Sequence, residues 1–134
     1  MKRILSVLAA AGLVAAAAPS LAADRAARGE AGLAKLLANR VPGKPVSCIN
    51  QRDIRSSQVL DGTAIVYEAF GKLYVNRPSG ASSLDDDDIL VTRTYTTQLC
   101  RMDTVRLVDR VARFERGFVS LNEFVPYEKP KKKS

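Results

Sequence analysis

The chain has 134 residues and a net charge of +7, from 21 lysines and arginines against 14 aspartates and glutamates, and it contains no histidine. Without histidine, Ser-His-Asp and Cys-His catalytic centres are excluded, and the most common zinc ligand is missing. The sequence also has no glycine-rich phosphate loop and no dinucleotide fingerprint. We therefore expect no cofactor.

The N-terminal residues have the pattern of a cleavable secretory signal peptide. Lys2 and Arg3 form a positively charged segment, an apolar run extends over residues 4–18, and Pro19 interrupts it. A transmembrane anchor is the alternative interpretation. The run of 15 residues is shorter than the roughly 20 apolar residues that a membrane-spanning helix needs, so we favour the signal peptide.

The expected cleavage site lies at residues 20–24. Ser20 and Ala22 place small side chains three residues and one residue before the cut, and Ala23 offers a second site one residue later. We therefore expect residues 1–23 to be removed and the mature protein to begin at Ala23 or Asp24, in the periplasm or secreted. A mature chain of 111 residues is long enough for one domain with its own core.

Residues 24–39 are predicted to form a helix. Leu33, Leu36 and Leu37 recur at the spacing that gives one apolar stripe. The helix should end before residues 42–45, where two prolines lack backbone donors. The stripe is compatible with a membrane-surface or partner-binding helix, but we favour packing against the protein's own sheet.

The chain after Pro45 changes to short segments typical of strands, separated by turn residues. Asp61-Gly62 and Gly71-Lys72 are two-residue hairpin signals. The predicted strands are residues 59–60, 63–70, 73–77, 89–95, 104–111 and 118–125. The expected fold is mainly β, with an N-terminal helix followed by a twisted antiparallel sheet or half-barrel of about six strands.

Residues 24–127 are thus expected to form a single domain, and residues 128–134 a basic disordered tail. The tail could dock weakly on anionic envelope components, at about 1 kcal/mol per lysine near a charged surface, or serve only solubility. Its four lysines and the leader carry most of the positive charge, so we expect no nucleic-acid partner. The tail lysines are Lys129, Lys131, Lys132 and Lys133.

Cys48 and Cys100, the two cysteines of the chain, are predicted to form an intramolecular disulfide. An exported protein meets an oxidising compartment, and two cysteines leave no thiol unpaired. A redox-active pair or a thiol nucleophile is the alternative. The distance between them in sequence and the lack of a Cys-x-x-Cys spacing favour the structural role.

Acidic residues offer weak candidates for chemistry. Four consecutive aspartates could supply oxygen ligands to calcium, but they lack the alternating spacing of a calcium loop, so we favour a solvated loop. Glu68 and Glu123 could act as a glycosidase pair. Exposed carboxylates on strands usually serve only the solubility of the protein, so we expect no catalytic residues. The four aspartates are Asp85, Asp86, Asp87 and Asp88.

Four short segments of the chain form a recognisable set: Pro45-Val46-Ser47-Cys48-Ile49, Leu73-Tyr74-Val75-Asn76-Arg77-Pro78, Gln98-Leu99-Cys100-Arg101-Met102-Asp103 and Phe124-Val125-Pro126-Tyr127. With these segments the chain resembles a family of small exported alphaproteobacterial proteins, hypothetical proteins of unknown function. The resemblance covers about residues 33–127 and implies an exported location but no activity. Some members have additional cysteines where this chain reads Gly80-Ala81-Ser82 and Arg116-Gly117-Phe118, so a second disulfide is not expected.

Three function classes remain open. An exported, non-catalytic envelope or periplasmic protein, either structural or a binding module, fits best, because a whole domain is present without a reactive constellation. Its partner would be an anionic envelope component or another periplasmic protein. A proteinaceous inhibitor of a periplasmic or host hydrolase is the alternative, with residues 78–88 as the inhibitory loop. An enzyme is the third class.

Overall fold

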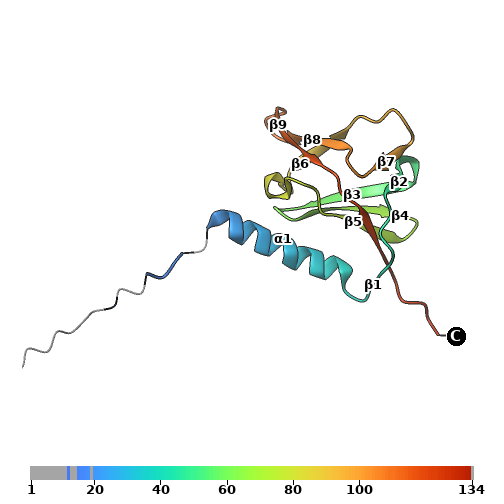
Figure 1. The fold of residues 1–134 in the computed structure, drawn as a ribbon, viewed down its shortest axis with the longest axis horizontal. Coiled ribbons are helices and arrows are strands. Elements are labelled where there is room, and N and C mark those ends of the chain that lie inside the picture. The colour runs from blue at the N-terminus through green and yellow to red at the C-terminus, as the bar shows by residue number, and fades with distance from the viewer. Residues whose placement is uncertain (1–11, 13–14, 19, 134) are drawn as a thin grey trace, which may run out of the picture.

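The computed structural model describes residues 12, 15–18 and 20–133 (Figure 1). Helix α1 (Leu21–Leu37) precedes all of the strands in these residues. The strands are β1 (Val41–Pro42), β2 (Cys48–Asn50), β3 (Ile54–Leu60), β4 (Ala64–Ala69), β5 (Lys72–Asn76), β6 (Asp88–Thr92), β7 (Gln98–Cys100), β8 (Thr104–Asp109), β9 (Glu115–Ser120) and β10 (Phe124–Glu128). The expected mainly β class with one N-terminal helix is confirmed.

The strands form three antiparallel sheets. The large sheet has the order β1-β10-β5-β4-β3, a second sheet pairs β2 with β7, and a third has the order β6-β8-β9. Helix α1 lies along one face of the large sheet, and the two smaller sheets lie on its other face (Figure 1). The molecule therefore has a helix layer and two β layers, rather than one sheet of about six strands.

Helix α1 begins at Leu21, three residues before the expected start, because the side chain of Ser20 accepts a hydrogen bond from the backbone N–H of Ala23. It ends at Leu37, well before Pro42. Leu33 is buried and packs on the helix-facing side chains of the large sheet, with Leu36 and Leu37 beside it. The apolar stripe thus packs on the protein's own sheet.

The main core fills the space between the large sheet and the two smaller ones. Phe124 of β10 is fully buried there, and its ring meets that of Tyr67 edge-on, with centroids 5.9 Å apart. Side chains from all three sheets belong to the same cluster, together with Leu84 and Leu121 of two loops: Ile49, Val59, Ile65, Leu99, Val105, Leu107 and Val119. Burial of this size is the main source of the fold's stability.

The C-terminal part of the chain differs from the sequence prediction. Residues 118–125 were expected to form one strand, but β9 ends at Ser120 and β10 begins at Phe124. The chain passes from the third sheet to the large sheet between them. Asn76, fully buried, holds this crossing: its side chain donates to the carbonyl of Asn122 (2.6 Å) and accepts from its N–H (3.0 Å).

Both hairpin turns also differ from the prediction. Leu60 pairs with Ala64, so the first loop has three residues instead of two. Ala69 pairs with Lys72, so the second turn is formed by Phe70 and Gly71 rather than by Gly71-Lys72. Both residues have a positive φ, as this tight hairpin turn requires, and Phe70 adopts it although bulky side chains disfavour it.

The two ends of the chain can be compared with the expected signal peptide and tail. Lys2, Arg3 and Pro19 lie outside the described residues. Within the described part of the chain, no helix is long and apolar enough to cross a membrane. Strand β10 extends through Glu128, one residue past the expected end of the domain. The residues from Lys129 to Lys133 are exposed and have no regular secondary structure.

Candidate functional site

Cys48 and Cys100 form a disulfide, as predicted. They are directly opposite each other in the β2–β7 pair, with their Cα atoms 4.0 Å apart. Such short distances are found between residues of a non-hydrogen-bonded antiparallel pair. The bridge is consequently part of a sheet, and neither sulfur is available for thiol chemistry in this state.

The four consecutive aspartates do not form one site. Asp88 is buried, and Arg116 donates two hydrogen bonds to its carboxylate, at 2.9 and 2.8 Å. Asp87 is exposed, and its backbone N–H donates to the side chain of Asp85. Only Asp85 and Asp86 contribute to a cluster of carboxylates.

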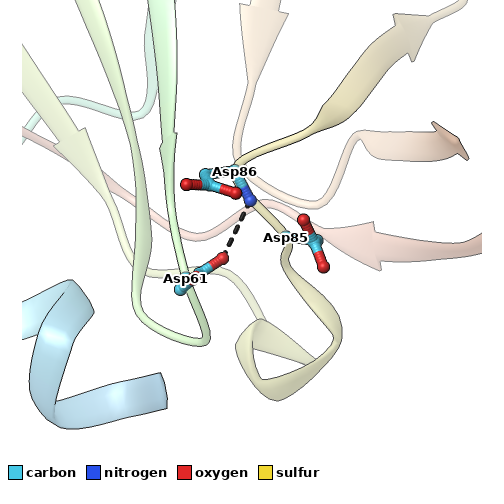
Figure 2. Close-up of side chains that lie close together, drawn as sticks. All are labelled: Asp61, Asp85 and Asp86. Carbon is cyan, nitrogen blue, oxygen red and sulfur yellow. Dashed lines mark hydrogen bonds between the residues drawn. The ribbon is translucent and has the colours of Figure 1, made fainter. Parts of the chain in front are cut away.

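The third member of that cluster is Asp61, from the β3–β4 turn (Figure 2). One carboxylate oxygen from each of Asp61, Asp85 and Asp86 lies within 4.8 Å of the others. The backbone N–H of Asp86 donates to Oδ1 of Asp61 at 2.9 Å, which fastens the acidic loop to the turn. The sequence indicated only a turn at Asp61, because nothing in the local sequence shows which loop lies beside it.

An arginine already neutralises part of this acidic cluster. The guanidinium of Arg25 on α1 lies 3.8 Å from the carboxylate of Asp61 and 3.3 Å from that of Asp85. Asp86 is in none of the ion pairs found among the described residues. The negative charge of Asp61, reinforced by Asp87 and Asp85, raises the pKa of Asp86. The cluster thus joins the helix to two loops and leaves an excess of negative charge at Asp86.

Three carboxylates are only part of the six to eight oxygen ligands that calcium takes. Arg25 supplies a positive charge to two of the three carboxylates. The arrangement is therefore explained as a structural ion-pair network. Of the four consecutive aspartates, only Asp85 and Asp86 lie close enough to Asp61 to bind a cation together with it.

A cavity of about 560 Å³ lies beside β10. We call it the β10 cavity. Val75, Val125 and Tyr127 line it from the large sheet, and Met102 and Leu121 contribute further apolar surface. The polar residues of its lining are Arg77, Ser79, Arg101, Ser120, Asn122 and Glu123. The cavity therefore offers both apolar contacts and two guanidinium groups to a ligand.

The two arginines of the β10 cavity are held differently. Arg77 makes two hydrogen bonds to the carboxylate of Glu30 on α1, which lower the pKa of Glu30. Arg101 has a single contact with Glu123 at 3.5 Å, and both side chains are about half exposed. Exposed pairs of this kind contribute little to stability. Arg101 is therefore free to exchange Glu123 for an anionic group of a ligand.

The segments that carry the family resemblance meet around this cavity. Phe124 pairs with Asn76 in the β5–β10 ladder and forms a bridge with Val46. The backbone N–H of Arg101 donates to the carbonyl of Ser47 at 2.7 Å. Three of the four segments contribute residues that line the cavity. The sequence alone had indicated no site for these motifs.

The remaining predicted residues occupy separate places. Glu68 accepts a hydrogen bond from Ser56, whereas Glu123 contacts Arg101, and the β10 cavity contains only the second of these glutamates. Leu84, within the loop of residues 78–88, is fully buried, so this loop is folded against the core instead of projecting from it.

Comparisons of the chain with protein-family models, with curated proteins and with solved structures found no match.

Proposed function

We propose that this protein is an exported, non-catalytic binding protein of the bacterial envelope, and that it holds an anionic envelope component in the β10 cavity. One observation carries the proposal. A cavity of about 560 Å³ combines an apolar lining with Arg101, whose guanidinium has only a loose, half-exposed carboxylate partner. A phosphate or carboxylate of a ligand would replace Glu123 at little cost, while its apolar part would contact Val125 and Tyr127.

Two features support export. The disulfide suits an oxidising compartment. The residues of α1 that pack on or bond to the rest of the protein begin at Arg25, whereas those from Leu21 to Asp24 are exposed. Cleavage before Asp24 would remove the Ser20 cap and keep the hydrogen bond of Arg25 to Leu84 and the packing of Leu33, Leu36 and Leu37 on the large sheet. We also propose membership of the exported family that the four motif segments resemble.

The lysine tail extends the proposed site. β10 places Val125 and Tyr127 at the cavity and ends at Glu128, directly before Lys129. Tail lysines would contribute salt-sensitive attraction to an anionic surface, and the cavity would supply the specific contact. The tail needs no fixed conformation for this role.

The proposal is tested by sedimentation with phosphatidylglycerol vesicles, with phosphatidylcholine vesicles as the uncharged comparison. Arg101→Ala should lower binding to the anionic vesicles about tenfold at moderate salt, as expected for a charge-assisted contact. Arg93→Ala removes an exposed arginine outside the cavity and should leave that binding unchanged. Deleting residues 129–134 should lower binding only at low salt, with an unchanged melting temperature. Equal effects of Arg101→Ala and Arg93→Ala would contradict the cavity as the site.

The inhibitor is the second candidate, although the buried Leu84 makes residues 78–88 a poor match to a projecting inhibitory loop. A pull-down from an envelope extract separates the two functions. Recovery of lipid or glycan supports envelope binding, whereas a single stoichiometric hydrolase supports inhibition.

A further inference from the structure

Polar and apolar side chains occupy different ends of the β10 cavity. Residues two apart on a strand share one face of a sheet, so Glu123, Val125 and Tyr127 follow one another along the cavity. β5 runs antiparallel to β10 and pairs Val75 with Val125, so Arg77 lies at the same end as Glu123. The cavity therefore has a polar end at Arg77 and Glu123 and an apolar end at Val125 and Tyr127.

The polar end offers one cationic group to a ligand. Three charged residues line the cavity, namely Arg77, Arg101 and Glu123. Glu30 of α1 neutralises Arg77 through two hydrogen bonds, whereas Arg101 has only its single contact with Glu123 at 3.5 Å. Because Glu123 is about half exposed, it can turn into solvent and leave the guanidinium of Arg101 to a phosphate or carboxylate, which pairs with it through two hydrogen bonds.

The apolar end is continuous with the core between helix α1 and the large sheet. Val75 is buried in that core, and Tyr127 and Leu37 pack against it. Val125 and Tyr127 themselves are only half-buried. An alkyl group that covered them would therefore extend an existing apolar surface and remove more of it from water.

Met102 adds an exposed apolar side chain at the rim of the cavity. It follows Arg101 directly, lines the cavity and is 74% exposed. Its backbone N–H donates to the carbonyl of Leu121 at 2.7 Å, which fixes the residue beside the chain crossing. Methionine is unbranched and adapts to irregular apolar surfaces, so this side chain is suited to cover a bound alkyl group.

We propose that the ligand of the β10 cavity is an anionic amphiphile with a single alkyl chain. Its phosphate or carboxylate binds Arg101, and its chain lies along Val125 and Tyr127 beneath Met102. The inference rests on the proposed function and names the class of its ligand. Neighbouring strands lie about 4.8 Å apart, so the apolar strip on β5 and β10 has the width of one chain rather than two. A cavity of about 560 Å³ is the size of a small-molecule site, which takes up one molecule instead of a membrane surface.

The test is calorimetric titration of the protein with butyl, hexyl, octyl and decyl phosphate, each below the concentration at which it forms micelles. Affinity should rise by up to about fourfold with each buried methylene and level off for chains that reach beyond Tyr127. Decanoate, the carboxylate probe, should bind at least tenfold more tightly than uncharged decanol. A preference for the phosphate or the carboxylate assigns the headgroup. An affinity independent of chain length, or equal binding of decanoate and decanol, overturns the proposal.

Two variants and a matched control separate the headgroup from the chain. Arg101→Ala should lower the affinity for all alkyl phosphates about tenfold, because the headgroup contact is lost. Met102→Ala should lower the affinity for decyl phosphate about fivefold and leave that for inorganic phosphate, measured by NMR, unchanged. Phe114→Ala removes an exposed apolar side chain outside the cavity and should change neither affinity. Equal effects of Met102→Ala and Phe114→Ala would overturn the placement of the chain.

The single-chain ligand and the proposed function fail in different ways. Binding to phosphatidylglycerol vesicles that depends on Arg101, without binding of any monomeric alkyl phosphate, overturns the single-chain ligand and leaves the proposed function standing. If Arg101→Ala changes binding neither to vesicles nor to alkyl phosphates, both proposals are wrong.

Discussion

Two regions of the β core are held by different kinds of interaction. Around the start of β10, main-chain pairing at Ser79–Ser120 and Val46–Phe124 joins the sheets, together with the disulfide. Around the acidic loop, residues 85–88, side-chain ion pairs hold the structure, chiefly Arg116–Asp88 within the third sheet and Arg25–Asp85 to the helix. Salt weakens exposed ion pairs but leaves backbone pairing and covalent bonds almost unchanged. The acidic loop should therefore loosen first.

Breaking the disulfide, beside the start of β10, should have the largest effect. The bridge closes a segment with a sequence separation of 52 residues, and opening it should lower the free energy of unfolding by about 4 kcal/mol in the chain-entropy model. The measurement is urea denaturation with and without reductant. The Cys48→Ser, Cys100→Ser double variant is the control and should be indifferent to reductant. An unchanged midpoint for the reduced native chain would contradict the prediction.

Removing Arg116 should be the largest single change at the acidic loop. Arg116→Gln leaves the carboxylate of Asp88, whose side chain is 1% exposed, without its charged partner, and we expect a loss of about 3 kcal/mol. Arg106→Gln breaks the more exposed pair with Glu115 and should cost under about 1 kcal/mol. Both values come from urea denaturation. Equal losses in the two variants would show that burial of Asp88 does not decide the effect.

The contact of the helix with the β3–β4 turn can be tested with two glycines. A Cβ atom on Gly29 would lie 2.1 Å from the carbonyl oxygen of Asp61 and 2.2 Å from Oγ1 of Thr63, so Gly29→Ala should destabilise the fold by about 2 kcal/mol. A Cβ on Gly32 meets only Leu60, at 3.4 Å. Gly32→Ala should therefore stabilise the fold by up to about 1 kcal/mol through helix propensity. Thermal unfolding of both variants measures the difference, and the same sign for both would refute it.

Tyr67, buried in the main core on β4, gives the smallest predicted effect. Burial raises the pKa of Tyr67, so the folded protein keeps the phenol neutral where the unfolded chain ionises it, at a pKa of about 10. Stability from this group is complete below pH 10 and should fall by about 1.4 kcal/mol per pH unit above it. Tyr67→Phe should remove that slope in urea denaturation between pH 9 and pH 11. If the variant keeps the same pH dependence, another ionisable group causes it and the prediction is wrong.

The sequence predictions were accurate where residues close together in the chain determine the structure, and less accurate where distant segments determine it. The helix followed from its own leucine spacing, and the β4–β5 hairpin was found within one residue of its turn. β2 and β7 were missed because three residues are too few to show alternation. The break between β9 and β10 has a local signal, because the buried positions change phase between Leu121 and Phe124.

The candidate sites were harder to predict than the fold. Asp85 and Asp86 were recognised only as part of the run of four aspartates, and their third partner, Asp61, lies in another loop. Arg77 and Arg101 were quoted only as parts of motifs, since their common cavity depends on β10 crossing to the large sheet.

The sequence by itself determined the mainly β class, the single N-terminal helix and the disulfide, because these depend on side-chain periodicity and on there being only two cysteines. The tertiary structure alone decided how the strands divide into three sheets, which carboxylates and arginines face each other, and which strand edges stay open. Those features depend on contacts between segments far apart in the chain, such as Phe124 with Val46 and Asp61 with Asp86. Such contacts form only when the apolar faces of different sheets are buried together, and no local pattern encodes them.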